Sequence, residues 1–143
     1  MANGKQVQVE TAAERMVGEW KRGMVAYMVL GLLLLRPMYG LEIKKEVEDG
    51  TQGKVKLGAS TLYQLLRRME RQGLVTSRWE RTTQGPPRAY YEPTAAGREV
   101  VRRFMLEVLS PDSPIAAALG QLTSRLFQKL ATEGGEQAEV SVE

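Results

Sequence analysis

The chain has 143 residues, of which 43% are apolar, and this is enough for one domain with a single core. It contains no cysteine and no histidine, which excludes disulfides, thiolate nucleophiles, zinc sites with Cys or His ligands and His-based acid–base chemistry. The net charge is only +3, but residues 54–103 hold eleven basic and four acidic residues, whereas residues 104–143 hold two basic and six acidic ones. The basic block indicates either a surface for a polyanion or an ordinary solvated face.

Neither a targeting segment nor a catalytic motif is recognisable. The first twenty residues carry charges of both signs, and the longest apolar run, Met24–Leu35, is too short to span a membrane. The remaining carboxylates, serines, tyrosines and lysines form no Walker loop, nucleophile elbow or paired acidic motif. We therefore expect a cytoplasmic protein that is not an enzyme and needs no cofactor or metal.

The N-terminal third predicts two helices. Thr11 and Glu14 have the spacing of a capping box, so an amphipathic helix is expected over Thr11–Arg22, with Gly23 at its end. The run Met24–Leu35 is apolar on nearly all sides, which predicts the central helix of the core.

The next segment predicts the second and third helices of a compact domain. Arg36-Pro37 should end the central helix, Tyr39–Asp49 resumes a helical pattern, and residues 49–53 form a turn. A helix over Ser60–Gln72 has apolar residues at i, i+3, i+4 and i+7, and Gly73 should stop it in a left-handed conformation.

A hairpin and two more helices complete the chain. Strands are expected over Leu74–Glu80 and Ala89–Glu92, on either side of a basic loop that contains Gly-Pro-Pro. Pro93 should not continue the ladder, Thr94 should cap a helix that reaches Leu109, and a last helix covers about Ile115–Leu130. Trp79 is interpreted as hairpin packing.

The expected fold is mainly α-helical with a small β-hairpin, arranged as a winged helix-turn-helix. The predicted divisions are an N-terminal amphipathic helix (1–23), the winged helix (24–94), C-terminal dimerisation helices (95–131) and a disordered acidic tail (132–143). Such a domain binds DNA by placing a helix in the major groove and the hairpin loop against the backbone or the minor groove. The candidate DNA-contacting residues are Ser60, Thr61, Tyr63, Gln64, Arg67, Arg68 and Arg71 on the helix, and Arg81, Gln84 and Arg88 on the loop.

Position on the helix suggests separate roles for these residues. Ser60, Thr61 and Gln64 should reach base edges, and the arginines should reach phosphates. Tyr63 has two interpretations of about equal weight, a phosphate contact or a half-buried core residue.

Three segments resemble the PadR family: residues 37–43 (PMYGLEI), 61–75 (TLYQLLRRMERQGLV) and 85–98 (GPPRAYYEPTAAGR). The resemblance implies a bacterial winged-helix repressor that dimerises through its C-terminal helices, often with help from the N-terminal segment. Its major-groove and wing-tip roles map onto Thr61, Tyr63 and Arg67, and onto Gly85, Pro86 and Arg88. The family often has Tyr at the position of Leu41, and Gly or Pro where Ser60 and Gln64 stand, so these two are candidates for operator specificity.

The resemblance also extends to a narrower group and to a dimer. A helix before the winged helix is shared with the cyanobacterial circadian period-extender proteins, which would make a clock gene the target. Candidate dimerisation residues are Met16, Trp20, Phe104, Val108, Leu119, Leu122 and Leu126, whose apolar stripes a winged helix alone could not cover.

Two other functions compete with an operator-binding repressor. The first is a regulator that senses a small molecule in a pocket at the dimer interface, where Trp20 would be a lining residue. The second is a winged helix that binds a protein partner. The expected partners are thus double-stranded operator DNA, a second copy of the chain, and an unidentified small-molecule effector in the first alternative.

Overall fold

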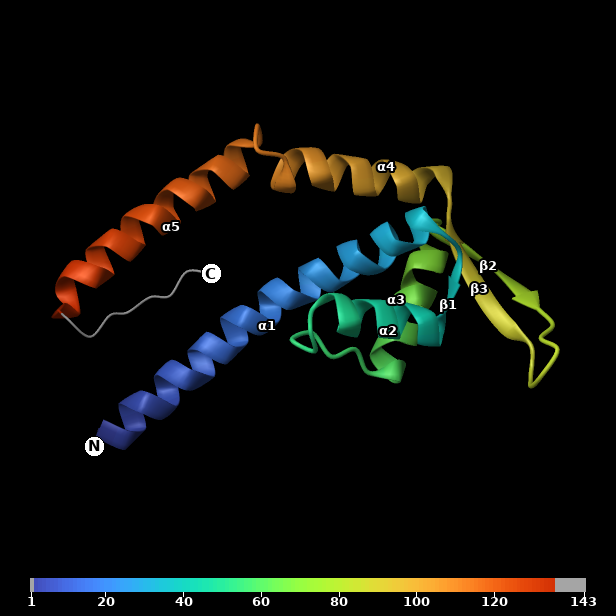
Figure 1. Cartoon of the computed structure of the whole chain (residues 1–143), viewed down its shortest axis with the longest axis horizontal. Coiled ribbons are helices and arrows are strands. Elements are labelled where there is room, and N and C mark those ends of the chain that lie inside the picture. Colours follow the sequence, from blue (N-terminus) through green and yellow to red (C-terminus); the bar gives the residue numbers. More distant parts are fainter. Residues whose placement is uncertain (1, 136–143) are drawn as a thin grey trace. The chain divides into compact units, whose positions relative to one another are not determined.

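The computed structural model describes the backbone of residues 2–135 and the side chains of residues 8–135. The chain divides into two compact units, residues 1–101 and 102–143. The elements, in chain order, are α1 (Ala2–Leu35), β1 (Met38–Tyr39), α2 (Gly40–Gly50), α3 (Ala59–Arg71), β2 (Val75–Glu80), β3 (Arg88–Pro93), α4 (Ala95–Phe104), the π-helical turn η1 (Met105–Leu109) and α5 (Pro114–Glu133) (Figure 1). The structure is mainly helical with a small antiparallel sheet, as predicted.

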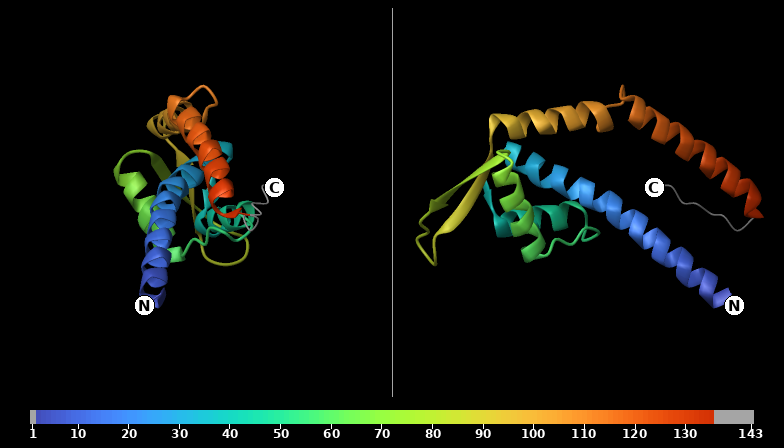
Figure 2. Two further views of the ribbon diagram at one scale, coloured as in Figure 1. Left: turned by 90° about the vertical axis from the view of Figure 1, so that its left-hand side faces the viewer. Right: turned by 180° about the vertical axis from the view of Figure 1, so that it is seen from behind.

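The first helix is one continuous element, whereas the sequence predicted two. Helix α1 passes through Thr11 and Gly23 without interruption, so the predicted capping box and the predicted helix end are both wrong (Figure 2). An internal glycine costs a helix only about 1 kcal/mol relative to alanine. The following apolar residues up to Leu35 are anchored in the core, and this anchoring lets the helix propagate through Gly23. The predicted break at Arg36-Pro37 is confirmed, because α1 ends at Leu35.

The core of the first unit lies where α1, α2, α3 and the sheet meet. Its fully buried members come from every one of these elements. They are Val29 and Leu33 of α1, Ile43 and Val47 of α2, Leu62 and Leu66 of α3, and Val75 of β2.

The sheet has three antiparallel strands in the order β1-β3-β2. The two-residue strand β1 was not predicted; it pairs Met38 with Tyr91 and Tyr39 with Tyr90. The prediction that Pro93 stops the ladder is also wrong, because Pro93 pairs with Val75 as the last residue of β3. The pairing with β1 ends at Tyr91, so β3 is an edge on that side at Pro93, where a residue without an N–H group is tolerated.

Two predicted caps are confirmed at the junction of α3, β3 and α4. Gly73 has φ +76°, and the Leu74 amide donates to the Met69 carbonyl at 2.9 Å, which ends α3. The Thr94 hydroxyl oxygen accepts from the Gly97 amide at 3.1 Å and donates to the Gly73 carbonyl at 2.6 Å. One hydroxyl therefore caps α4 and ties it to the end of α3.

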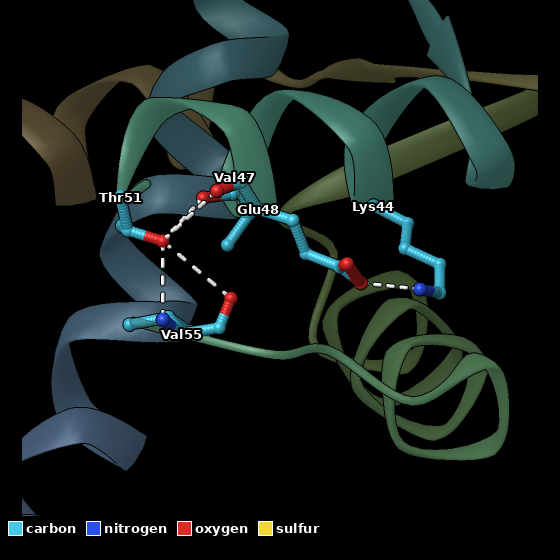
Figure 3. Close-up of polar contacts among 5 residues, drawn as sticks. All are labelled: Lys44, Val47, Glu48, Thr51 and Val55. Atoms are coloured by element: carbon cyan, nitrogen blue, oxygen red, sulfur yellow. Dashed lines mark hydrogen bonds and ion pairs between the residues drawn. The ribbon is translucent and has the colours of Figure 1, made fainter. Parts of the chain in front are cut away.

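A threonine also fixes the loop between α2 and α3 (Figure 3). The Thr51 hydroxyl donates to the Val47 carbonyl of α2 at 2.8 Å and accepts from the Val55 amide at 3.1 Å. Val55 and Leu57 in this loop are buried. The loop is therefore held at a defined place beside α2.

The second unit holds the end of α4, η1 and α5. Ser113 is buried; its hydroxyl donates to the Glu107 carbonyl and accepts from the Ala116 amide, which caps α5. Helix α5 reaches Glu133, so the predicted tail, which starts at 132, begins too early, and its residues 136–143 lie outside the described residues. That residues 1–23, 24–94 and 95–131 act as separate functional parts stays a prediction.

Candidate nucleic-acid interface

Helix α3 has one buried face and one exposed face. Leu62, Leu65, Leu66 and Met69 are all at most 7% exposed and fix the helix on the core. All seven predicted contact residues of this helix are exposed, as the spacing requires: Ser60, Thr61, Tyr63, Gln64, Arg67, Arg68 and Arg71. The structure therefore brings them together on the surface of one helix.

The cations on this face are not neutralised by neighbours. Among the side chains of residues 8–135, no ion pair involves Arg67, Arg68 or Arg71. The only acidic residue of α3, Glu70, accepts a hydrogen bond from the Ser77 hydroxyl of β2 at 2.7 Å. The exposed face thus keeps its positive charge available for an external anion.

Tyr63 is partly exposed and packs against α2, and its role as a phosphate contact stays a prediction. Its side chain is 38% exposed, and its ring lies against the backbone of Gly40 at the start of α2. A Cβ atom at position 40 would stand 2.6 Å from the Tyr63 hydroxyl oxygen and 2.9 Å from Cζ, closer than contact allows. Gly40 is therefore needed for this close approach, by which α3 packs against the start of α2.

The predicted wing is an exposed loop at the end of the β2–β3 hairpin (Figure 1). Arg81 and Gln84 lie in this loop and are exposed. The Thr82 hydroxyl organises the loop by donating to one of three facing carbonyls, with oxygen–oxygen distances of 2.9 Å to Gln84, 3.0 Å to Gly85 and 3.2 Å to Pro86. Both predicted contact residues are thus carried on a loop with internal order.

Two residues of the hairpin differ from their predicted placement. Arg88 is the first residue of β3 rather than part of the loop, and its guanidinium carbon lies 4.4 Å from the centre of the Tyr39 ring. The stacking arises because β1, which the sequence did not reveal, places Tyr39 beside β3. Trp79 is 73% exposed, so its interpretation as hairpin packing is wrong.

Comparison with known proteins identifies the family. Residues 29–103 match the model of the PadR-like family of transcriptional regulators. A PadR-family regulator from Eggerthella lenta is 30% identical, with a TM-score of 0.60 over 88% of this chain and 98% of that one. The chain belongs to the PadR-like family. It is therefore a transcriptional regulator, and its winged helix-turn-helix is the type of module with which such regulators bind DNA.

Two further structures share the fold of this PadR-like regulator. A transcriptional regulator from Clostridium thermocellum is 25% identical, with a TM-score of 0.55 over 79% of this chain and 95% of that one. Bacillus subtilis PadR, solved in complex with operator DNA, is 19% identical, with a TM-score of 0.54 over 74% of this chain and 66% of that one. The narrower likeness to the period-extender proteins stays a prediction.

The predicted dimerisation residues of the regulator fall into two groups. Met16 and Trp20 on α1 are 73% and 64% exposed, and Leu119, Leu122 and Leu126 on α5 are 45–57% exposed. Phe104 and Val108 are half-buried. The first group offers apolar surface, and the role of both groups in a dimer stays a prediction.

Neither a candidate metal-binding cluster nor a candidate membrane-spanning helix occurs in the part of the regulator that the structure describes. Residues 8–135 contain no cluster of Asp and Glu side chains suited to a metal ion. No helix among them is both long and apolar enough to cross a bilayer.

Sequence reasoning missed four basic residues that lie beside the predicted contacts. Lys21 and Arg22 of α1 and Lys54 and Lys56 of the α2–α3 loop line a groove together with Thr61, Gln64 and Arg68 of α3. Only the high basic content of residues 54–103 hinted at the two loop lysines. Nothing in the sequence connected Lys21 and Arg22 with them, because they lie more than thirty residues earlier in the chain.

Proposed function

We propose that this PadR-like regulator binds operator DNA as a homodimer in the bacterial cytoplasm and represses transcription there. The observation that carries the proposal is the exposed face of α3, which presents three arginines without ion-pair partners among residues 8–135. A helix of this kind fits the major groove of B-DNA, and unpaired cations gain most from contact with phosphates. Bacillus subtilis PadR, which shares the fold, was solved in complex with operator DNA, and this supports DNA as the partner.

The proposed contacts follow the position of each residue on the module. Ser60, Thr61 and Gln64 occupy the N-terminal half of α3, from which residues of groove-bound helices reach base edges. Arg67, Arg68, Arg71 and Tyr63 contact phosphates. In the wing, Arg81, Gln84 and Arg88 contact the backbone or the minor groove.

The proposed dimer rests on apolar surface that this chain leaves exposed. Leu119, Leu122, Leu126 and Leu130 recur along α5 and are 45–58% exposed, and among its twenty residues none is buried. An apolar stripe of this length on a regulator indicates a protein partner. A second copy of the chain is the proposed partner, because a two-fold dimer buries the same stripe from both subunits and matches an operator with two half-sites.

The decisive experiment measures DNA binding with and without sequence specificity. Duplexes selected by the wild-type protein from a random pool define the operator, and a scrambled duplex gives the non-specific affinity. Gln64→Ala should lose about 1–3 kcal/mol of binding to the operator only, because an amide pairs bidentately with adenine. Arg67→Ala should weaken both duplexes together and reduce the salt dependence. If the wild type selects no sequence and binds duplex DNA without salt dependence, the proposed function is wrong.

The dimer and the repression have separate tests. Leu122→Glu should shift the sedimentation coefficient to that of a monomer, whereas Gln128→Glu, on the opposite face of α5, should leave it unchanged. A wild-type protein that sediments as a monomer would exclude the dimer. Addition of the protein should lower transcription in vitro from a promoter that carries the selected site, and a rise in transcript would show an activator instead.

A further inference from the structure

A groove lies in the first unit between α1, the loop after α2, and α3. Its volume is about 510 Å³, and its polar lining is strongly basic. We call it the basic groove and define it by its five cationic residues, Lys21, Arg22, Lys54, Lys56 and Arg68. No carboxylate is among its lining residues in the described part of the chain.

The walls of the basic groove are fixed by the fold. Its floor is formed by Val25 together with the buried side chains of Val55, Leu57 and Leu65. The Lys21 ammonium group donates to the Lys54 carbonyl at 3.1 Å, which joins α1 to the loop. Together with the Thr51 hydrogen bonds of Figure 3, this contact holds the loop lysines at the edge of the groove.

The positive charge of the basic groove is only weakly compensated by carboxylates of the chain. None of the five takes part in an ion pair with a side chain of residues 8–135. The carboxylate of Glu48 interacts with Lys56 over a distance, but it is engaged in a hydrogen bond from Lys44 (Figure 3). Like charges held together by the fold repel one another, so an anion with several negative charges relieves this repulsion when it binds.

The position of the basic groove beside α3 indicates which polyanion binds in the groove. Thr61, Gln64 and Arg68 lie on the flank of α3 that borders the groove. The opposite flank faces the start of α2 and the hairpin, where Tyr63 contacts Gly40 and Glu70 accepts from Ser77. A helix with its side chains is about 10–12 Å wide, and the major groove is about 12 Å wide. A helix that fills the major groove therefore has a phosphate backbone along each flank.

We infer that the basic groove holds the DNA phosphate backbone on the flank of α3 that faces away from the hairpin. This makes Lys21 and Arg22 of the N-terminal helix part of the DNA-binding surface, so that the surface extends beyond the winged helix itself. The inference rests on the proposed function and adds a second line of phosphate contacts to it. The hairpin contacts the phosphate backbone of the other DNA strand, so that α3 lies between the two backbones.

The test compares salt dependence in variants of the full chain. The variant Arg22→Gln/Lys54→Gln/Lys56→Gln removes three groove cations and leaves Lys21 in place to hold the loop. The matched control is Arg15→Gln, which lies seven residues earlier on the same face of α1, about 10 Å from Arg22 along the axis. Binding to the scrambled duplex is measured by fluorescence anisotropy at several salt concentrations, and circular dichroism checks that each variant is folded.

Each phosphate contact contributes about 0.9 to the slope of log K against log salt. We expect the triple variant to lose about 2.7 of the wild-type slope, so that between 50 and 200 mM salt the wild-type affinity falls about 40-fold more than that of the variant. Arg15→Gln should keep the wild-type slope. The loss of slope is divided by the number of charges removed, which is one in Arg15→Gln and three in the groove variant. If this loss per charge were equal in the two variants, the inference would be overturned, because the effect would then follow net charge alone.

The outcomes separate the inference from the proposed function. A triple variant with the wild-type slope, next to a wild type that binds steeply, overturns the basic groove as a phosphate site and leaves operator binding by α3 intact. A wild type that does not bind duplex DNA overturns both.

Discussion

Replacement of Gly97 by alanine should destabilise the winged helix, although alanine is normally the better helix residue. Gly97 lies in the first turn of α4, where an added Cβ would stand 2.2 Å from the Leu74 carbonyl oxygen and 3.4 Å from Cδ1 of Leu30. The carbonyl oxygen cannot move cheaply, because it accepts a hydrogen bond from the Thr94 amide at 3.0 Å. Overpacking costs about 1–3 kcal/mol and a weakened hydrogen bond about 0.5–1.5 kcal/mol, while helix propensity returns at most about 1 kcal/mol. The net result should be a loss of about 0.5–4.5 kcal/mol.

Urea unfolding followed by far-ultraviolet circular dichroism measures this change as a lower midpoint at an unchanged slope. The control is Gly23→Ala, because Gly23 lies inside α1 with nothing within 4 Å of an added Cβ. That variant should be more stable by up to about 1 kcal/mol, so the two substitutions should have opposite signs. If Gly97→Ala were as stable as the wild type, α4 would not approach Leu74 as closely as described. If Gly23→Ala were destabilising, α1 would not be one continuous helix.

Three further predictions concern the α2–α3 loop, the pH dependence of stability and the packing of α3 against α2. Thr51→Val should lower the free energy of unfolding by about 1–3 kcal/mol, because the Val47 carbonyl and the Val55 amide each lose a hydrogen bond to the hydroxyl. Thr51→Ser keeps the hydroxyl and should retain most of the stability in the same urea titration. The pKa of Glu48 lies below its ordinary value because Lys44 donates to its carboxylate, so this carboxylate stabilises the fold above its unfolded pKa and the contribution is lost as pH falls. Wild-type stability should thus fall more than that of Glu48→Gln between about pH 5 and pH 3, and parallel curves would contradict the assignment. Gly40→Ala should lower the unfolding midpoint through its overlap with Tyr63, and the double variant Gly40→Ala/Tyr63→Ala should show a smaller added loss than the two single changes together.

The sequence by itself determined the elements whose signals are local. The repeat of apolar residues in α3 sets both its buried face and its exposed face, because 3.6 residues per turn fix the side of every residue once the helix forms. Gly73 marks the end of α3 and Thr94 the start of α4, through hydrogen bonds that span at most five positions. Only the hydrogen bond from the Thr94 hydroxyl to the Gly73 carbonyl joins more distant residues. Such signals lie within a few residues of one another, so they can be recognised before the fold is known.

Only the tertiary structure decided the features that join distant segments. Gly23 looks like a helix end in the sequence, yet the anchoring of the residues after it in the core outweighs its small local cost. Strand β1 exists because Met38 and Tyr39 find partners more than fifty residues later, and the same pairing stacks Arg88 on Tyr39. The basic groove likewise forms when the core brings α1 beside the α2–α3 loop, so that Lys21 meets Lys54 across 33 residues. The path of the chain through the core sets these contacts, and no local pattern of residues encodes that path.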